Sequence, residues 1–238
     1  RSMSFLIAVH VNEGIVLASD RRVTYTNTQT IGTITVQRIG IHSTNSTNKT
    51  FACPNGAGIA TCGDASLEGK PITGFIQEMI RTKIDKETPV ENIPQIIVDY
   101  FNALSTVPDT HFIVAGYSME EAEKKQLIYK INVKTKTIEP QNTSSQGATW
   151  DGEIATLTRL IQNVAVKDVN GNYIDLPFED ILWSYFTLQD AVDFARYAVE
   201  TTIQTMRFKN VIETVGGKVD ILIITPEETK WLQKEEIS

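Results

Sequence analysis

The sequence has too little of several features that mark common classes of protein. Its 238 residues carry more acidic than basic side chains and a net charge of −7, whereas a surface that binds nucleic-acid phosphates needs an excess of Lys and Arg. No apolar run approaches the roughly 20 residues that a membrane-spanning helix needs. No secretory signal precedes the first predicted strand. These absences predict a cytoplasmic protein that binds neither nucleic acid nor membrane.

Motifs for metals, nucleotides and histidine-based catalysis are missing as well. Cys53 and Cys62 show no metal-ligand spacing and are predicted to be buried thiols. The sequence contains no P-loop, no His-Glu-x-x-His zinc motif and no Gly-x-Ser-x-Gly elbow. Its three histidines, at positions 10, 42 and 111, are scattered without a partner suggested by spacing. We therefore expect no cofactor and no metal.

The sequence does contain a clear order of secondary structure. Short apolar segments around Gly-containing turns predict β-hairpins over residues 4–19 and 49–62. Apolar residues at helical spacing predict four helices, the last opened by a capping box at Thr187. The first expected helix follows Asp64, which is its cap. The other three cover residues 90–104, 149–164 and 187–207. Further strands are expected over residues 32–42, 111–116, 126–132, 137–141, 219–225 and 230–232. The expected order along the chain is strands, two helices, strands, two helices and strands. This order favours sheets packed face to face with helices outside.

Two segments near the start resemble a known family. The run from Ser4 to Val11, continued from Gly14 to Thr24, resembles without a gap the start of mature proteasome β subunits and of the bacterial proteasome-related Anbu proteins. Weaker matches at residues 63–65, 112–117 and 216–220 extend the resemblance over nearly the whole chain. It implies an α+β fold, the four-layer α-β-β-α sandwich of N-terminal-nucleophile (Ntn) hydrolases. It also implies a homo-oligomer, as a ring or a stacked assembly.

The resemblance assigns roles to individual residues. It places Ser4 at the nucleophile position, Asp20 at the acidic position, Lys49 at the lysine position and Gly63 at the oxyanion corner. Supporting positions map onto Arg22 and Ser145, and the specificity pocket maps onto Val23, Thr61 and Ala65. Because the three pocket residues are small and uncharged, we expect neutral apolar residues before the cleaved bond.

The chemistry explains why so few residues suffice. A serine hydroxyl is a poor nucleophile, but an N-terminal serine brings its own general base, an α-amino group with a reference pKa of about 7.7–8.0. A buried Lys49 ammonium would favour ionisation of the hydroxyl while Asp20 holds that ammonium charged, and the Gly63 N–H could stabilise the oxyanion. The expected activity is that of a peptidase or amidohydrolase acting on a peptide or amide substrate.

Each of these residues also has an ordinary interpretation. Ser4 could simply begin a strand, Asp20 could cap a turn and pair with Arg21 or Arg22, and Lys49 could be a solvated charge at a strand end. Their joint match to one ungapped motif favours the catalytic interpretation. Two alternatives stay open: a non-catalytic, proteasome-like structural subunit, and an Ntn amidase that acts on small amides.

The first three residues determine whether Ser4 has a free α-amine that can act as the general base. Arg1 and Ser2 precede Met3, the expected natural start, so residues 1–3 are predicted to be foreign residues plus the initiator Met. Residues 4–238 are then expected to form a single domain. Removal of Met3 before the small Ser4 would give Ser4 a free amine, whereas the chain that keeps residues 1–3 has an amide there and should be inactive.

Overall fold

The computed structural model of the protein describes residues 4–118 and 124–234. These ranges contain four α-helices, two five-stranded sheets and three two-stranded sheets. This mixture of helices and largely antiparallel sheets agrees with the predicted α+β class. In the same ranges, no helix is long and apolar enough to span a bilayer.

The first five-stranded sheet contains the N-terminal strand next to its central strand. Its order is β12 (Gly147–Gly152), β1 (Phe5–Val11), β2 (Gly14–Ser19), β15 (Asp220–Ile224) and β16 (Thr229–Gln233). All neighbouring strands are antiparallel. The β1–β2 hairpin predicted from the sequence is confirmed, and it lies between two strands from much later in the chain.

The second five-stranded sheet carries the Gly63 corner. Its order is β11 (Thr137–Pro140), β10 (Gln126–Asn132), β9 (Thr110–Tyr117), β6 (Gly58–Gly63) and β5 (Thr50–Ala52). The predicted hairpin over residues 49–62 is therefore confirmed as β5 and β6. Because β5 follows Lys49 directly, the sheet brings this lysine to the same end of the molecule as Gly63.

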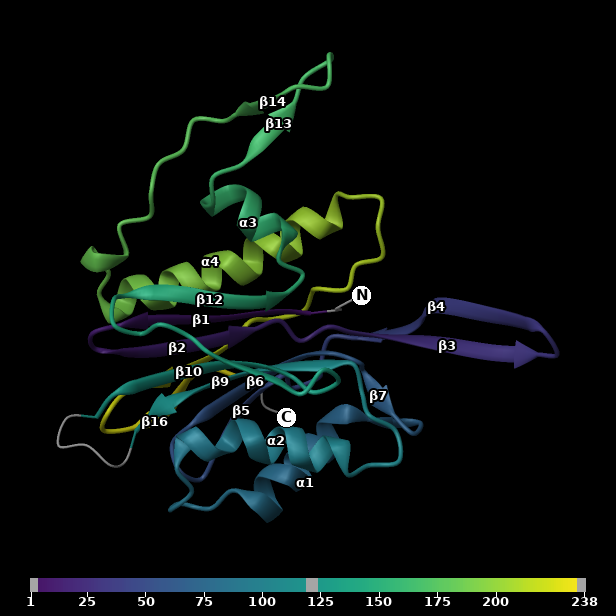
Figure 1. The fold of residues 1–238 in the computed structure, drawn as a ribbon, viewed down its shortest axis with the longest axis horizontal. Helices are drawn as coiled ribbons and strands as arrows, with labels where there is room; N and C mark the ends of the chain where they lie inside the picture. Colours follow the sequence, from purple (N-terminus) through teal and green to yellow (C-terminus); the bar gives the residue numbers. More distant parts are fainter. Residues whose placement is uncertain (1–3, 119–123, 235–238) are drawn as a thin grey trace.

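The two sheets lie face to face, with a pair of helices outside each (Figure 1). Helices α3 (Ala155–Ile161) and α4 (Leu188–Arg207) lie on the outer side of the first sheet. Helices α1 (Ile72–Lys83) and α2 (Ile93–Asn102) lie on the outer side of the second. Successive residues of a strand face opposite sides, so Phe5 and Ile7 pack toward α4 whereas Leu6 packs between the sheets. Burial on both sides explains the unbroken apolar run of β1.

Two helices match the sequence patterns that predicted them. At α4 the Thr187 hydroxyl accepts the Asp190 N–H, and the Asp190 side chain accepts the Thr187 N–H, which completes the predicted capping box. Pro94 lies in the first turn of α2, where its missing N–H removes no helical hydrogen bond. A short 3₁₀ turn, Val90–Asn92, precedes this helix.

Two other helix predictions are wrong at their N-terminal ends. Helix α1 begins at Ile72 and not after Asp64, because Asp64 accepts the Asp109 N–H (2.7 Å) and the small hairpin of β7 (Ser66–Leu67) and β8 (Lys70–Pro71) follows. The helix expected over 149–164 is shorter: its first residues form β12, and only α3 is helical. Those residues pair with β1 on the side that β2 leaves free, and they therefore form a strand.

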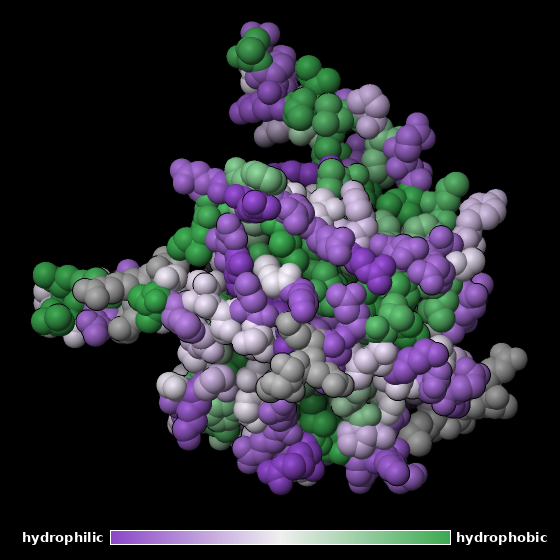
Figure 2. Space-filling view, turned by 180° about the vertical axis from the view of Figure 1, so that it is seen from behind, coloured by the Kyte–Doolittle hydropathy of each residue, from purple (hydrophilic) through white to green (hydrophobic). Residues whose placement is uncertain are grey.

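Two hairpins extend away from the sheets and were not predicted as such. One contains β3 (Val23–Ile31) and β4 (Ile34–Thr44), and the other contains β13 (Ala165–Lys167) and β14 (Tyr173–Asp175) (Figure 1). The Thr- and Asn-rich β3 lacks the apolar alternation that indicates a strand, so only its partner was expected. Ile31 and Ile34 at the tip of the first hairpin are exposed, and Figure 2 shows apolar surface there.

Candidate active site

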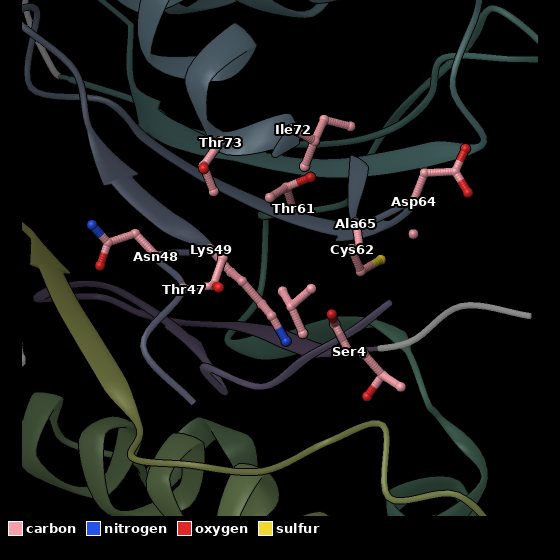
Figure 3. Close-up of a pocket in the computed structure, with 13 residues that line it drawn as sticks. Ser4, Thr47, Asn48, Lys49, Thr61, Cys62, Asp64, Ala65, Ile72 and Thr73 are labelled. Carbon is pink, nitrogen blue, oxygen red and sulfur yellow. The ribbon is translucent and has the colours of Figure 1, made fainter. Parts of the chain in front are cut away.

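A cleft lies where β1, β5 and β6 approach one another at one end of the two sheets (Figure 3). The cleft is small, with a cavity volume of about 20 Å³. Ser4 lies just before β1, Lys49 just before β5, and Gly63 at the end of β6, and all three line this cleft. The structure thus brings the predicted nucleophile, lysine and oxyanion positions together.

Lys49 and Asp20 form a buried ion pair at the base of the cleft. Lys49 Nζ lies 2.8 Å from Asp20 Oδ1, and the side chains are 3% and 0% exposed. Lys49 Nζ also donates to the carbonyl of Arg22. Burial lowers the pKa of Lys49 below its ordinary value, and the charge of Asp20 and its hydrogen bond oppose that shift.

Asp20 is held by the backbone as well as by Lys49. Its Oδ1 accepts the Phe5 N–H (3.1 Å), while its Oδ2 accepts the N–H groups of Arg22 (3.0 Å) and Gly216 (2.9 Å). Three backbone donors and one ammonium satisfy a carboxylate that is closed to water. Asp20 therefore ties the first residues of β1 to the lysine and to the segment before β15.

The backbone at Ser4 is fixed from both sides. Its carbonyl accepts the Glu153 N–H at 2.7 Å, and the next N–H, that of Phe5, is bound to Asp20. Gly152 lies so close that a Cβ at this position would be 2.0 Å from the Ser4 oxygen, and its φ is +91°. Glycine is required there for the β12 strand to approach Ser4. Ser4 itself is only 4% exposed.

Gly63 also has a geometry that only glycine accepts. Its φ is +114°, and a Cβ would lie 2.3 Å from the carbonyl oxygen of Asp109. The neighbouring Asp64 N–H donates to the same carbonyl at 3.1 Å. The turn at the end of β6 is therefore fixed against the start of β9, with Gly63 in the wall of the Ser4 cleft.

The three residues predicted to form a specificity pocket lie in this cleft. Val23, Thr61 and Ala65 all line it, together with Ile72 and Thr73 from the start of α1. None of the five carries a charge. These five neutral residues share the lining of the cleft with the charged Lys49 and Asp64.

Arg22 contacts both Asp20 and Lys49 through its backbone, whereas its side chain has other partners. Its guanidinium pairs with Glu213 and donates to Asn45 Oδ1 at 2.8 Å. The neighbouring Arg21 forms a buried ion pair with Asp220 at 3.1 Å. These acidic partners come from the C-terminal part of the chain, and no local spacing in the sequence indicates them.

The ordinary interpretation holds for the turn at Asp20, whose Oδ2 accepts the Arg22 N–H two residues on, but it is wrong for the ion pairs and for Lys49. Asp20 pairs with neither Arg21 nor Arg22 through its side chain, since those arginines pair with Asp220 and Glu213. Lys49 is not a solvated charge, because its side chain is 3% exposed. Asp20 and Lys49 instead pair with each other, while Arg21 and Arg22 pair with acidic residues of the C-terminal part of the chain.

Ser145 is a predicted site residue that the structure places away from Ser4. Its carbonyl lies 2.9 Å from His10 Nε2, near the end of β1 opposite to Ser4. The register pairs His10 with Gly147 and Phe5 with Gly152. This corrects the expectation: because residues 147–152 form a strand, the segment that reaches Ser4 is Gly152–Glu153. No serine stands there.

Comparison with known proteins rests on structure alone. No model of a protein family matches the sequence, and no curated protein matches it. Solved structures do match. A Gly-1 mutant of Anbu from Hyphomicrobium sp. strain MC1 has a TM-score of 0.59 and 12% identity, covering 99% of this chain and 87% of the other.

A second structure of Anbu from the same organism gives a TM-score of 0.56 at 14% identity, covering 98% of this chain and 88% of that one. Similarity over nearly the full length of both chains, at this low identity, is evidence about the fold. The chain therefore shares the fold of Anbu, a bacterial proteasome-related Ntn hydrolase.

Proposed function

We propose that the protein is a proteasome-like Ntn peptidase or amidohydrolase with the four-layer α-β-β-α architecture, in which Ser4 is the nucleophile. The observation that carries the proposal is the buried Lys49–Asp20 pair in the same cleft as Ser4. Burying two charges costs several kcal/mol each unless they are paired and hydrogen-bonded, and a buried ionisable group with a shifted pKa, such as Lys49 in this cleft, marks a candidate functional site.

The mechanism begins from a form of the chain in which Ser4 is the first residue. The Ser4 hydroxyl attacks the substrate carbonyl carbon while its proton passes to the Ser4 α-amine. The oxyanion accepts the Gly63 N–H, and the protonated amine then gives its proton to the leaving nitrogen. Water hydrolyses the resulting ester with the same amine as base, which regenerates Ser4.

Lys49 and Asp20 serve this chemistry electrostatically. The Lys49 ammonium, held by Asp20, favours negative charge that develops on the Ser4 oxygen during attack. Because both side chains are buried, their charges are weakly screened by solvent and salt. The arrangement needs no histidine.

One observation favours the second candidate, a non-catalytic structural subunit. Ser145, the supporting hydroxyl that the resemblance implies, lies at the far end of β1, and Gly152 stands near Ser4 in its place. Assembly into a homo-oligomer is common to both candidates. It stays a prediction, which light scattering tests against the mass of one chain.

Labelling with an acylating probe distinguishes the two candidates. A protein that begins at Ser4 is expected to gain the mass of one β-lactone or epoxyketone probe, measured by intact mass spectrometry, because its α-amine can act as base. A Ser4→Ala variant with the same start, and the chain that retains residues 1–3, are expected to stay unlabelled. A protein that begins at Ser4, has a native circular dichroism spectrum and stays unlabelled would favour the structural subunit.

The cleft wall predicts the substrate preference. Val23, Thr61 and Ala65 offer no charge to pair with a charged side chain, so cleavage is expected after neutral apolar residues. A fluorogenic peptide library, assayed with the protein that begins at Ser4, measures this preference. An Ala65→Asp variant is the matched test, since it should shift cleavage toward Arg and Lys; a wild-type preference for Arg or Asp would contradict the assignment of the pocket. Turnover of small amides alone would favour the amidase alternative.

A further inference from the structure

A second cluster of reactive side chains lies next to the Ser4 cleft, where three strands meet. Cys62 is on β6, His111 on β9 and Asp151 on β12, so the cluster joins both large sheets. One potential ligand atom from each residue lies within 4.8 Å of the other two. Within residues 4–118 and 124–234, no other group of three His, Cys, Asp or Glu residues is arranged in this way.

The distances within the cluster suit a metal ion. His111 Nδ1 lies 3.2 Å from Asp151 Oδ2. Zinc–nitrogen and zinc–oxygen bonds of about 2.0–2.2 Å place two ligands of a tetrahedral ion roughly 3.4 Å apart. Cys62 lies opposite His111 in the β6–β9 ladder, so its sulfur is held on the same side by the register of the sheet. Small movements of three side chains would complete three bonds to one ion.

Space for a fourth ligand exists beside the cluster. A cavity of about 180 Å³ is lined by His111, Asp151, Lys130, Asn132 and Glu139. This volume is ample for a water molecule, which occupies roughly 30 Å³ in the liquid. On its other side, Cys62 lines the Ser4 cleft (Figure 3). The cluster is thus open to solvent from the cavity and adjacent to the candidate active site.

We propose that Cys62, His111 and Asp151 bind one divalent transition-metal ion, with Zn²⁺ as the ion that best suits the donor set. Mixed sulfur, nitrogen and carboxylate ligands are typical of zinc, whereas Mg²⁺ and Ca²⁺ prefer oxygen ligands alone. Three protein ligands leave one position for water. Because the ligands come from both large sheets, the bound ion would crosslink the sheets beside the Ser4 cleft.

Binding requires specific rearrangements of the neighbours. The Thr135 N–H donates to Asn132 Oδ1 at 3.0 Å, which leaves Asn132 Nδ2 facing His111 Nε2 at 3.0 Å. An ion on Nδ1 requires a proton on Nε2, so the Asn132 amide must rotate and accept that proton through its oxygen. Thr135 is exposed, and water can replace its lost partner. The Cys62 thiol releases its proton to solvent.

Lys130 is the main competitor of a metal ion. Its Nζ lies 3.7 Å from Asp151 Oδ2, and its side chain is 30% exposed. At 3.7 Å the contact is a long one for an ion pair, and the partly exposed ammonium can move into solvent when an ion binds. Lys130→Met removes the competing charge without adding a ligand, and it should therefore strengthen metal binding.

Co²⁺ is the probe for the site, because it replaces Zn²⁺ and reports its ligands by absorption. One equivalent of Co²⁺ is expected to bind and to show a thiolate-to-cobalt charge-transfer band. The band should be absent from Cys62→Ser and weakened in Asp151→Asn. It should persist in Cys53→Ser, which alters a buried thiol outside the cluster. Zn²⁺, but not Mg²⁺, should raise the melting temperature of the wild-type protein by several degrees.

Two outcomes would overturn the proposal: a folded wild-type protein that gives no charge-transfer band, or a band that persists in Cys62→Ser. If Cys62→Ser fails to fold, the Lys130→Met variant decides the question. It is expected to bind Co²⁺ several-fold more tightly than the wild-type protein. Unchanged or weaker binding would show that the ion is not held at Asp151. None of these measurements depends on Ser4, so the proposal can fail while the proposed function holds.

Discussion

An Asp20→Ala variant is expected to lose about 3–5 kcal/mol of unfolding free energy, because removal of one partner leaves a buried charge uncompensated. Asp20 is 0% exposed and holds Lys49 together with three backbone N–H groups. The alanine variant leaves all four donors without that acceptor. Urea unfolding followed by circular dichroism measures the loss.

Two control variants test whether this loss of stability is specific to Asp20. Asp193→Ala removes an exposed carboxylate of α4 that pairs with Arg196, and it should cost less than about 1 kcal/mol. Adding Lys49→Met to Asp20→Ala should recover part of the loss, since the uncompensated cation is then gone. An Asp20→Ala loss as small as that of Asp193→Ala would contradict the role of Asp20 as the buried centre of these contacts.

The second large effect concerns reactivity and rests on the proposed function. In the protein that begins at Ser4, Lys49→Met is expected to slow acylation by about 10²–10³-fold, the usual cost of removing one electrostatic donor from a catalytic site. Methionine keeps the length and apolar stem of the side chain, and three backbone N–H groups still bind Asp20, so Lys49→Met should destabilise the fold less than Asp20→Ala does. The rate of probe attachment, followed by intact mass, gives the comparison.

Lys134→Met is the matched control for that comparison. Lys134 is 62% exposed and pairs with Asp109 at 3.7 Å, outside the Ser4 cleft. Its loss should leave the acylation rate within a factor of two. If Lys49→Met reacted within tenfold of the wild-type rate while keeping its circular dichroism spectrum, Lys49 would have no role beyond packing and pairing.

Local patterns were sufficient to predict much of the candidate site. The β1–β2 hairpin follows from two short apolar segments around a Gly-containing turn, and the hairpin after Lys49 follows from a similar pattern. Ser4, Asp20 and Lys49 all lie at the ends of these hairpins, so the predicted hairpins place them correctly. The resemblance supplied their roles, and in the structure Ser4 and Lys49 line one cleft while Asp20 pairs with Lys49.

The sequence patterns could not predict which strands pair when they are distant from one another in the chain. The apolar spacing of Ile154, Leu157 and Leu160 indicates a helix. The predicted helix was therefore extended over residues that form the preceding strand, β12. The misplacement of Ser145 followed from the same error. Cys62, His111 and Asp151 show no ligand spacing because each comes from a different strand, and only the packing of two sheets brings them together.

The contacts of Asp20 also constrain when the site can form during synthesis. Phe5, Arg22 and Lys49 are made early, but Gly216, which gives Asp20 its last backbone donor, belongs to the final part of the chain. Ribosomes add about 5–20 residues per second, so a delay on the order of ten seconds separates Lys49 from Gly216. During that interval β2 also lacks its neighbour β15. A growing chain therefore carries the proposed nucleophile long before it carries a complete candidate site, and a truncated chain that lacks the C-terminal strands would remain without one.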